Sequence, residues 1–172
     1  KRLDDDADFI GQVCVEYGEF ISELELWNEP NNRIKWNFPE EDPHWEKFGY
    51  MIGVAGERAA EFGRTAVLGG IIPVDHHWLN LMKGYGALEH IPIIAIHGFP
   101  EMWGPHLNWK WYTRRAGWEQ KVEYISRHAE GRPVWLTETG LATWEREQRR
   151  HGRHELQARL LRDAVAAPVP RV

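Results

Sequence analysis

Apolar side chains recur along the chain at two different spacings. A spacing of three or four residues predicts a helix, whereas a short apolar or alternating run predicts a strand. Apolar positions at the helical spacing predict helices at about 5–17, 42–62, 77–83, 118–129 and 153–166. Apolar or alternating runs predict strands at 23–29, 65–71, 93–97 and 133–139. Helices and strands therefore alternate along the whole chain.

Capping and turn residues mark several of the element ends. Asp42 followed by Pro43 predicts a helix start, with Asp42 as the cap and Pro43 at the first helical position. Gly18 and Gly63 predict the ends of the two helices that precede them. Pro30 predicts the end of the first strand, because proline has no N–H to donate to a ladder.

The first predicted strand has an alternating pattern of side chains. Successive side chains of a strand point to opposite faces of the sheet. Leu24 and Leu26 are therefore expected on one face. The other face is expected to carry Glu25, Trp27 and Glu29.

The alternation of helices and strands predicts an α/β fold with a parallel sheet, because parallel strands need helical crossovers between them. Two architectures are compatible with this pattern, the closed (β/α)8 TIM barrel and the open doubly wound sheet. None of the predicted strands is followed by a glycine-rich phosphate-binding sequence. This argues against the dinucleotide-binding version of the open sheet.

Length and composition indicate a globular domain. At 172 residues with 42% hydrophobic content, the chain can bury one sizeable core, which predicts one domain or part of one. The longest apolar run, 91–96, is too short to span a bilayer, and the start of the sequence does not resemble a signal peptide. We therefore expect a soluble protein without a membrane partner, while the sequence leaves its compartment open.

Charge and cysteine content argue against two further classes of protein, those that bind nucleic acid and those stabilised by internal disulfides. The net charge of −5 comes from 26 acidic and 21 basic residues scattered along the chain, so a nucleic-acid partner is not expected. The single cysteine, Cys14, excludes an internal disulfide and is expected as a small core residue of the first helix. The chain opens on Lys1 rather than Met, with a helical pattern already under way, which predicts a piece of a longer protein.

Two glutamates stand at the carboxyl ends of predicted strands. Glu29 ends the first strand, and Glu138 stands near the end of the fourth. In a barrel of parallel strands, catalytic groups collect at that end of the sheet, so both carboxylates are expected at one mouth. A pair of carboxylates flanking a bond is what glycoside hydrolysis needs. Either glutamate taken alone is best interpreted as a solvated surface residue. Only the two together favour a catalytic interpretation.

Two motifs resemble those of clan A glycoside hydrolases. Residues 26–31, Leu-Trp-Asn-Glu-Pro-Asn, resemble the strand 4 motif of that clan, and residues 135–140, Trp-Leu-Thr-Glu-Thr-Gly, resemble its strand 7 nucleophile motif. They stand in the expected order, three strands apart, with His97 between them. The resemblance covers essentially the whole chain and implies one glycosidase-like domain over 1–172 that corresponds to strands 4 to 7 of a TIM barrel. Within the clan, the chain is most similar to family 39 β-xylosidases and their relatives.

The resemblance implies a retaining β-glycosidase that hydrolyses O-glycosidic bonds of oligosaccharides or polysaccharides by double displacement, with β-xylosides as candidate substrates. Glu29 would act as general acid/base, and Glu138 would act as nucleophile. Asn28 would hydrogen-bond the sugar 2-hydroxyl. His97 would line the active-site opening of the barrel. Trp27 would support the catalytic residues without contacting the sugar.

Several polar residues keep alternative interpretations. Glu25 shares the predicted face of Glu29 and could support it by hydrogen bonding, or could be a buried structural carboxylate paired with a basic side chain. His97 could be a satisfied core histidine or a site residue. The histidine pairs within 76–77 and 151–154 invite a metal interpretation. No acidic or cysteine partner completes a ligand set, so neither a metal nor a cofactor is expected.

The chain has ten Trp residues, and several fall in loop-like segments. Trp36 follows the first predicted strand, while the long loop after the third contains Trp103, Trp109 and Trp111. These loops open on the catalytic face, where flat aromatic rings stack on sugars. One or two of the rings are expected to bind the carbohydrate, and the others to pack the loops against the barrel.

The chain departs from the clan in length and at one position. A complete barrel takes about 250 residues, so strands 1 to 3 and strand 8 are expected from a longer chain or from a second chain. Position 99 is Phe where the family often has Tyr. Two other functions stay open, a non-catalytic carbohydrate-binding remnant and another clan A enzyme such as an endo-glycanase. An inverting hydrolase is less favoured, because its carboxylates lie roughly 6.5 to 9.5 Å apart instead of about 5 to 5.5 Å.

Overall fold

The computed structural model describes four stretches of the chain, residues 4–32, 38–99, 117–141 and 153–166. Within them, four parallel strands form one sheet in the order β1-β2-β3-β4. The strands are β1 (Glu23–Leu26), β2 (Thr65–Ile71), β3 (Ile93–His97) and β4 (Val134–Glu138). The order of the strands in the sheet is therefore their order in the chain.

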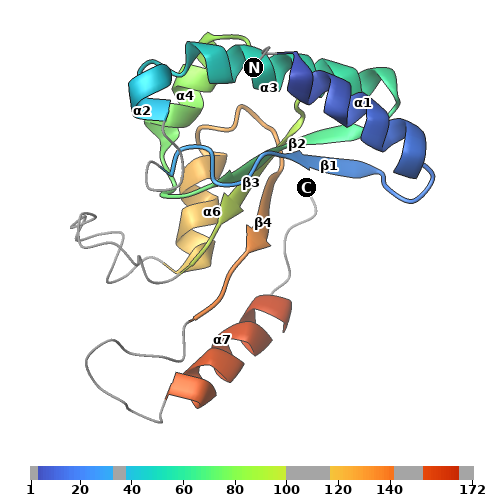
Figure 1. Cartoon of the computed structure of the whole chain (residues 1–172). Coiled ribbons are helices and arrows are strands. Elements are labelled where there is room, and N and C mark those ends of the chain that lie inside the picture. The colour runs from blue at the N-terminus through green and yellow to red at the C-terminus, as the bar shows by residue number, and fades with distance from the viewer. Residues whose placement is uncertain (1–3, 33–37, 100–116, 142–152, 167–172) are drawn as a thin grey trace.

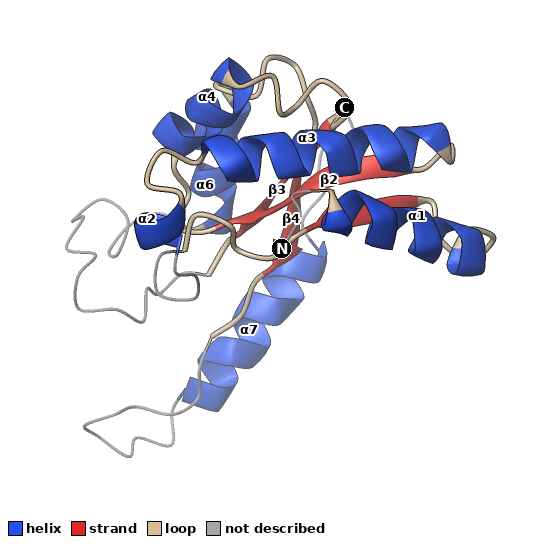
Figure 2. Ribbon diagram, turned by 45° about the horizontal axis from the view of Figure 1, so that its top comes forward, coloured by secondary structure: helices blue, strands red, loops and turns tan. Residues whose placement is uncertain are grey.

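Helices precede, connect and follow the strands, and all but the last of them lie along the sheet (Figure 1). They are α1 (Asp5–Tyr17), α2 (Phe38–Glu41), α3 (Glu46–Glu61), α4 (His76–Gly84), α6 (Trp118–Ser126) and α7 (Arg153–Ala166). Figures 1 and 2 show α1 and α3 side by side over the sheet, whereas α7 extends away from them. The parallel sheet with helical connections confirms the predicted α/β class.

The main core lies between the sheet and the helices. Leu68 and Ile94 of the two central strands are fully buried there, and Phe48 of α3 packs in the same cluster. Leu79 of α4 and Ile125 of α6 join it from the other helices. Burying a side chain of this size contributes about 1.5–3 kcal/mol relative to leaving it exposed. This layer therefore holds most of the buried apolar surface of the described residues.

The opposite face of the sheet has a smaller apolar cluster. Val67, Ile93 and Ala95 form it, on β2 and β3. Both central strands are therefore buried on two faces, which explains their continuous apolar sequences. Within the described residues, β1 pairs only with β2 and β4 only with β3. The outer strand β4 is accordingly more open, and its Trp135 is 37% exposed.

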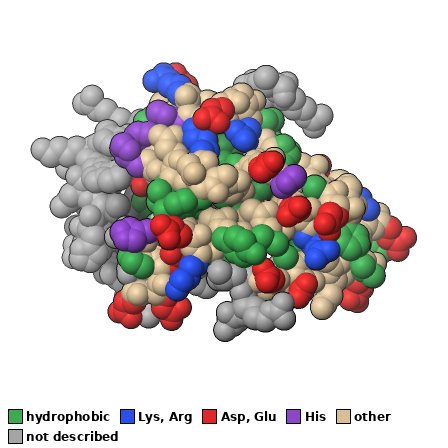
Figure 3. All heavy atoms as spheres, turned by 90° about the horizontal axis from the view of Figure 1, so that it is seen from above, with side chains coloured by type: hydrophobic (Ala, Val, Ile, Leu, Met, Phe, Trp, Pro, Cys, Tyr) green, Lys and Arg blue, Asp and Glu red, His purple; other side chains and the backbone are tan. Residues whose placement is uncertain are grey.

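Polar and charged side chains cover the outside of the helix layer. Figure 3 shows acidic and basic side chains interspersed on the described part of this face. The exposed ion pair of Arg58 and Glu61 on α3 is of the kind that contributes about 0–1 kcal/mol, so the apolar core dominates stability. Cys14 is buried in α1, as predicted for a core residue. Among the described helices, none combines the length and the apolar character needed to cross a membrane.

The helix predicted to start at Asp42 begins later. α3 starts at Glu46, after Trp45, whose φ of 63° is in the left-handed region. A left-handed residue interrupts right-handed helical backbone, so Asp42 and Pro43 lie outside α3. Asp42 still stabilises the helix start, because its carboxylate accepts a 2.9 Å hydrogen bond from the backbone N–H of Phe48.

The first strand ends three residues earlier than its alternation predicts. β1 stops at Leu26, and Trp27 and Glu29 have φ values of 69° and 49°. Left-handed residues turn the chain out of the ladder, so the alternation of faces ends with the strand. Trp27 packs edge-on against Phe48 of α3, with ring centroids 6.0 Å apart. The prediction that Trp27 shares a face with Glu25 is wrong.

The other elements agree closely with the predicted ranges. α1, β2, β3 and α7 have the predicted bounds, and α4 and β4 differ by one residue at each end. α6 ends at Ser126, earlier than the apolar spacing predicts. The chain turns after it, with Glu130 and Gly131 at φ values of 55° and 80°.

Candidate functional site

Two carboxylates and an imidazole meet at the carboxyl end of the sheet. His97 Nδ1 lies 3.0 Å from Glu29 Oε1 and 3.5 Å from Glu138 Oε2. One donor atom from each of the three side chains lies within 4.8 Å of the other two. A carboxylate oxygen of Glu29 is therefore within 4.8 Å of one of Glu138, although 108 residues of sequence separate them.

The ends of β3 and β4 place two of these side chains next to each other. His97 is the last residue of β3, and it pairs in the sheet register with Glu138, the last residue of β4. The ladder continues one step further, because the N–H of Gly98 donates to the Glu138 carbonyl at 2.8 Å. The backbone therefore fixes the relative position of the imidazole and the Glu138 carboxylate.

Glu29 reaches the same place from a turn instead of a strand. The N–H of Asn32 donates to the Glu29 carbonyl at 3.0 Å, and the Asn32 side-chain amide donates to Glu29 Oε2 at 2.9 Å. Glu29 has the left-handed φ of 49°, a conformation that costs about 1–3 kcal/mol for a residue with a side chain. Such backbone persists where surrounding contacts hold it, and it clusters at functional sites.

The two carboxylates differ in their access to solvent. The Glu29 side chain is 8% exposed, whereas the Glu138 side chain is 50% exposed. His97 is buried, at 1% exposed, and contacts both. His97 is thus a buried histidine and a member of the carboxylate cluster at once. An incoming molecule can reach Glu138 directly, while Glu29 lies deeper.

Glu25 stands beside His97 on the far side from Glu29. Its Oε1 accepts hydrogen bonds from the N–H of Gly70 at 2.7 Å and from Thr137 Oγ1 at 3.2 Å. The same oxygen lies 3.9 Å from His97 Nε2. Glu25 therefore ties β1 to β2 and β4 beside His97, and its support of Glu29 stays a prediction.

The other predicted residues divide into three groups. Asn28 is exposed and stands in the turn next to Glu29. Trp27 is directed toward α3, away from Glu25, because its backbone is left-handed. The predicted sugar-stacking rings lie outside the described residues, and they are Trp36, Trp103, Trp109 and Trp111.

Two asparagines belong to the site although the sequence did not single them out. Asn32 holds the Glu29 carboxylate, as described above. Asn31 is buried, accepts from the N–H of Ile72 at 2.9 Å and donates to the Pro73 carbonyl at 2.7 Å. It fixes the turn after β1 to the segment after β2. The sequence signal for both asparagines was their position directly after Glu-Pro, because the side-chain amides of Asn commonly form hydrogen bonds with the backbone of turns.

Two glycines of β2 make room for the cluster. A Cβ on Gly70 would lie 2.0 Å from the His97 imidazole. A Cβ on Gly69 would lie 2.1 Å from the Trp27 carbonyl oxygen. Glycine inside a strand often marks such a close approach, and this was the sequence signal for both positions.

Among the described residues, Glu29, His97 and Glu138 are also the group whose donor atoms lie close enough together to hold a metal ion. The 3.0 Å contact between His97 Nδ1 and Glu29 already uses the nitrogen that faces both carboxylates. A metal ion bound there would have to replace this hydrogen bond. The geometry therefore favours a carboxylate pair bridged by an imidazole, and the expected absence of a metal stays a prediction.

A second group of histidines lies between α4 and α6. The ring of His76 lies 3.8 Å from that of His77 and stacks on that of His128 at 4.2 Å, measured between centroids. Tyr124 Oη contacts His76 Nδ1. Burial and the neighbouring histidines lower the pKa of His76, and Asp75 opposes this shift. Among the described residues, these histidines are not part of a group whose donor atoms come close enough together to hold a metal ion.

Acidification is expected to destabilise the fold through His76. Its folded-state pKa is below the unfolded value, so the unfolded state binds more protons below about pH 6.5. The stabilisation is complete above that value and is lost as pH falls through the lower folded pKa. Thermal melting between pH 7.5 and 5 should fall more steeply in the wild type than in His76→Gln. Equal pH slopes for both proteins would contradict this role of His76.

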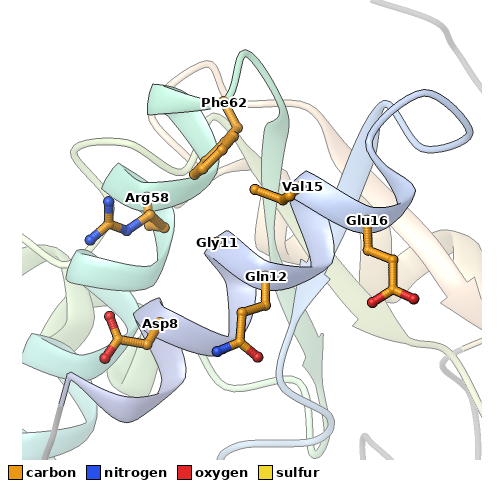
Figure 4. A pocket seen from close by; sticks show the side chains of 7 residues that line it. All are labelled: Asp8, Gly11, Gln12, Val15, Glu16, Arg58 and Phe62. Atoms are coloured by element: carbon orange, nitrogen blue, oxygen red, sulfur yellow. The ribbon is translucent and has the colours of Figure 1, made fainter.

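A groove on the helix layer is separate from the carboxylate cluster. It lies between α1 and the end of α3, has a volume of about 590 Å³ and contains none of the site residues named above. Figure 4 shows its lining side chains, with Val15 and Phe62 on facing sides. The groove therefore adds no group to the chemistry at the sheet end.

Comparison of this chain with models of protein families, with curated proteins and with solved structures gives no match in any of the three.

Proposed function

We propose that the chain is the catalytic part of a retaining β-glycosidase, which hydrolyses O-glycosidic bonds by double displacement. The observation that supports this most is the approach of Glu29 and Glu138 to within 4.8 Å of each other around His97. Retaining glycosidases have carboxyl groups about 5 to 5.5 Å apart, whereas inverting enzymes keep them roughly 6.5 to 9.5 Å apart. The nearest oxygens of the two carboxylates lie within 4.8 Å, which the retaining spacing allows, and the stereochemistry of turnover decides between the two classes.

The proposed scaffold is a (β/α)8 barrel in which the sheet supplies strands 4 to 7. Two features support it, the chain-order parallel sheet and the position of the site at the carboxyl ends of β1, β3 and β4. Active sites of such barrels lie at that end of the strands. The open outer edges of β1 and β4 in the described residues are where further strands would pair.

In the first step, Glu138 attacks the anomeric carbon, and the bond to the leaving oxygen breaks. Glu29 gives its proton to that oxygen, so the alcohol departs and a glycosyl ester on Glu138 remains. In the second step, Glu29 takes a proton from water, the water oxygen attacks the anomeric carbon, and Glu138 leaves as a carboxylate. Two inversions give net retention.

The exposure of the two carboxylates agrees with these roles. Glu138 is half exposed, so an anomeric carbon can approach it from the open side. Glu29 is buried and held by Asn32, so its position relative to the bond is fixed. His97 contacts both carboxylates and maintains their separation. Asn28, exposed and next to Glu29 in sequence, would bind the sugar 2-hydroxyl.

The stereochemistry of turnover tests the proposal. Incubation with a panel of aryl β-glycosides that includes the β-xyloside should release the aryl group, and ¹H NMR at early times should show the β-anomer first. A retaining mechanism makes the same anomer as the substrate, and the α-anomer then appears only by mutarotation. First appearance of the α-anomer would contradict a double displacement. Oligosaccharide binding without turnover would instead support the non-catalytic carbohydrate-binding alternative.

A further inference from the structure

A buried lysine lies behind the site and takes no part in the proposed chemistry. Lys121 on α6 has no solvent exposure, and its Nζ donates to the backbone carbonyl of Phe99. Burial lowers its pKa to about 8. A fully buried lysine is rare, because a lysine charge is normally left in water. The contacts of Lys121 indicate what it does for the site.

The helix that carries Lys121 packs on β4 and closely approaches Gly98, the residue after β3. A Cβ on Gly98 would lie 2.8 Å from Trp118 Cβ and 2.4 Å from Leu136 Cδ1, so only glycine allows this approach. Lys121 follows Trp118 by three residues, so the two occupy the same side of α6. The first turns of α6 therefore hold the backbone at Gly98 and Phe99 from one side.

The residue that Lys121 holds is in contact with the site. The ring of Phe99 meets the imidazole of His97 edge-on, with centroids 6.2 Å apart and an interplanar angle of 84°. His97 in turn contacts Glu29 and Glu138 through Nδ1. A continuous series of contacts thus runs from the Lys121 ammonium through Phe99 and His97 to both carboxylates.

Two simpler roles fit the observations less well. A lysine that forms a Schiff base must be reached by its substrate, and Lys121 has no exposed surface. A lysine that only joins a helix to a loop has no need to hold the residue whose ring contacts His97. Lys83 shows the purely structural case, because its Nζ binds the His128 carbonyl at 2.9 Å and the Glu130 carboxylate at 2.9 Å, away from His97.

We infer that Lys121 is a positioning residue, which sets the place of His97 by fixing Phe99 and thereby sets the separation of Glu29 and Glu138. The inference deepens the proposed glycosidase function and rests on it for its catalytic consequence. Its structural part, the dependence of His97 on Lys121, does not need turnover.

Replacement of Lys121 by methionine tests both parts. Lys121→Met keeps the length of the stem and removes the donor, and Lys83→Met is the matched control. On an aryl β-glycoside, kcat should fall about tenfold to 100-fold in Lys121→Met, with KM within about twofold, because small displacements of catalytic groups have effects of this size. Lys83→Met should leave kcat within about twofold. In NMR spectra, the His97 side-chain resonances should shift only in Lys121→Met.

A measurement on the unchanged protein covers the case in which the methionine variant does not fold. The His97 resonance should show an inflection near pH 8 as Lys121 loses its proton, and the resonance of the exposed His90 should not. Absence of turnover in the wild type would remove the proposed function, and the His97 resonances alone would then decide the positioning role. Unchanged His97 resonances in folded Lys121→Met, or a wild-type His97 resonance without an inflection near pH 8, would overturn the inference.

Discussion

Glu138→Ala is expected to lower kcat/KM on aryl β-glycosides by about 10⁴-fold or more, the scale seen when a residue that acts chemically is removed. In the proposed mechanism, the variant loses the oxygen that attacks the anomeric carbon, and the other carboxylate of the described cluster, Glu29, is buried. The fold should persist, because this side chain is half exposed. Steady-state kinetics with circular dichroism as the folding control measures both quantities.

Azide distinguishes the roles of the two carboxylates. In Glu138→Ala, azide can enter the space left by the carboxylate and attack the anomeric carbon, which should restore turnover and give the α-glycosyl azide. In Glu29→Ala the nucleophile remains, so azide should intercept the glycosyl ester and give the β-glycosyl azide. Glu89→Ala, which removes an exposed glutamate away from the cluster, should behave like the wild type. Identical azide products from the two site variants would contradict the assignment of roles.

Gly70→Ala is expected to damage both stability and activity. Its new Cβ would lie 2.0 Å from the His97 imidazole, which is buried and cannot move into solvent. Overpacking of this kind costs about 1–3 kcal/mol in the free energy of unfolding. Because His97 contacts both carboxylates, its displacement should also lower kcat/KM by about 100-fold. Urea denaturation and steady-state kinetics measure the two effects.

Gly84 offers the matched control for this substitution. It is the last residue of α4, and a Cβ there would meet no atom within 4 Å. Gly84→Ala should therefore leave kcat/KM unchanged and should not destabilise the fold, since the glycine-to-alanine difference inside a helix is about 0.5–1 kcal/mol in favour of alanine. If Gly70→Ala matched Gly84→Ala in both measurements, His97 would not be fixed in the way the structure indicates.

The sequence predicts most accurately the elements whose patterns are local. β2 and β3 have their predicted bounds because both are continuous apolar runs in the middle of the sheet. The end of β1 and the start of α3 were predicted wrongly. Trp27 and Trp45 have left-handed backbone there, and a tryptophan in the sequence does not predict that conformation.

The same holds for the site residues: those marked by their local sequence could be predicted, and those that matter through contacts far along the chain could not. Glu29, His97 and Glu138 could be selected from sequence, because each stands at or just after the carboxyl end of a predicted strand. Lys121 could not, since its importance comes from a contact with a residue far along the chain. Gly70 had only the general signal of a glycine inside a strand, which does not say what approaches it. A lysine on an amphipathic helix is normally read as a solvated charge. Only the packing of α6 against β4 and against the residues after β3 shows that this one is buried.

The strand order of the sheet bears on how the fold can form and change. Each strand pairs with the strand that precedes it in the chain, so every new βα unit docks on one that already exists. Assembly can therefore follow the direction of synthesis, without a late strand inserting between two earlier ones. For the same reason, a gene that gains or loses a βα unit at either edge leaves the inner pairings intact. The arrangement of β1 to β4 is thus one that duplication and trimming can lengthen or shorten by whole units.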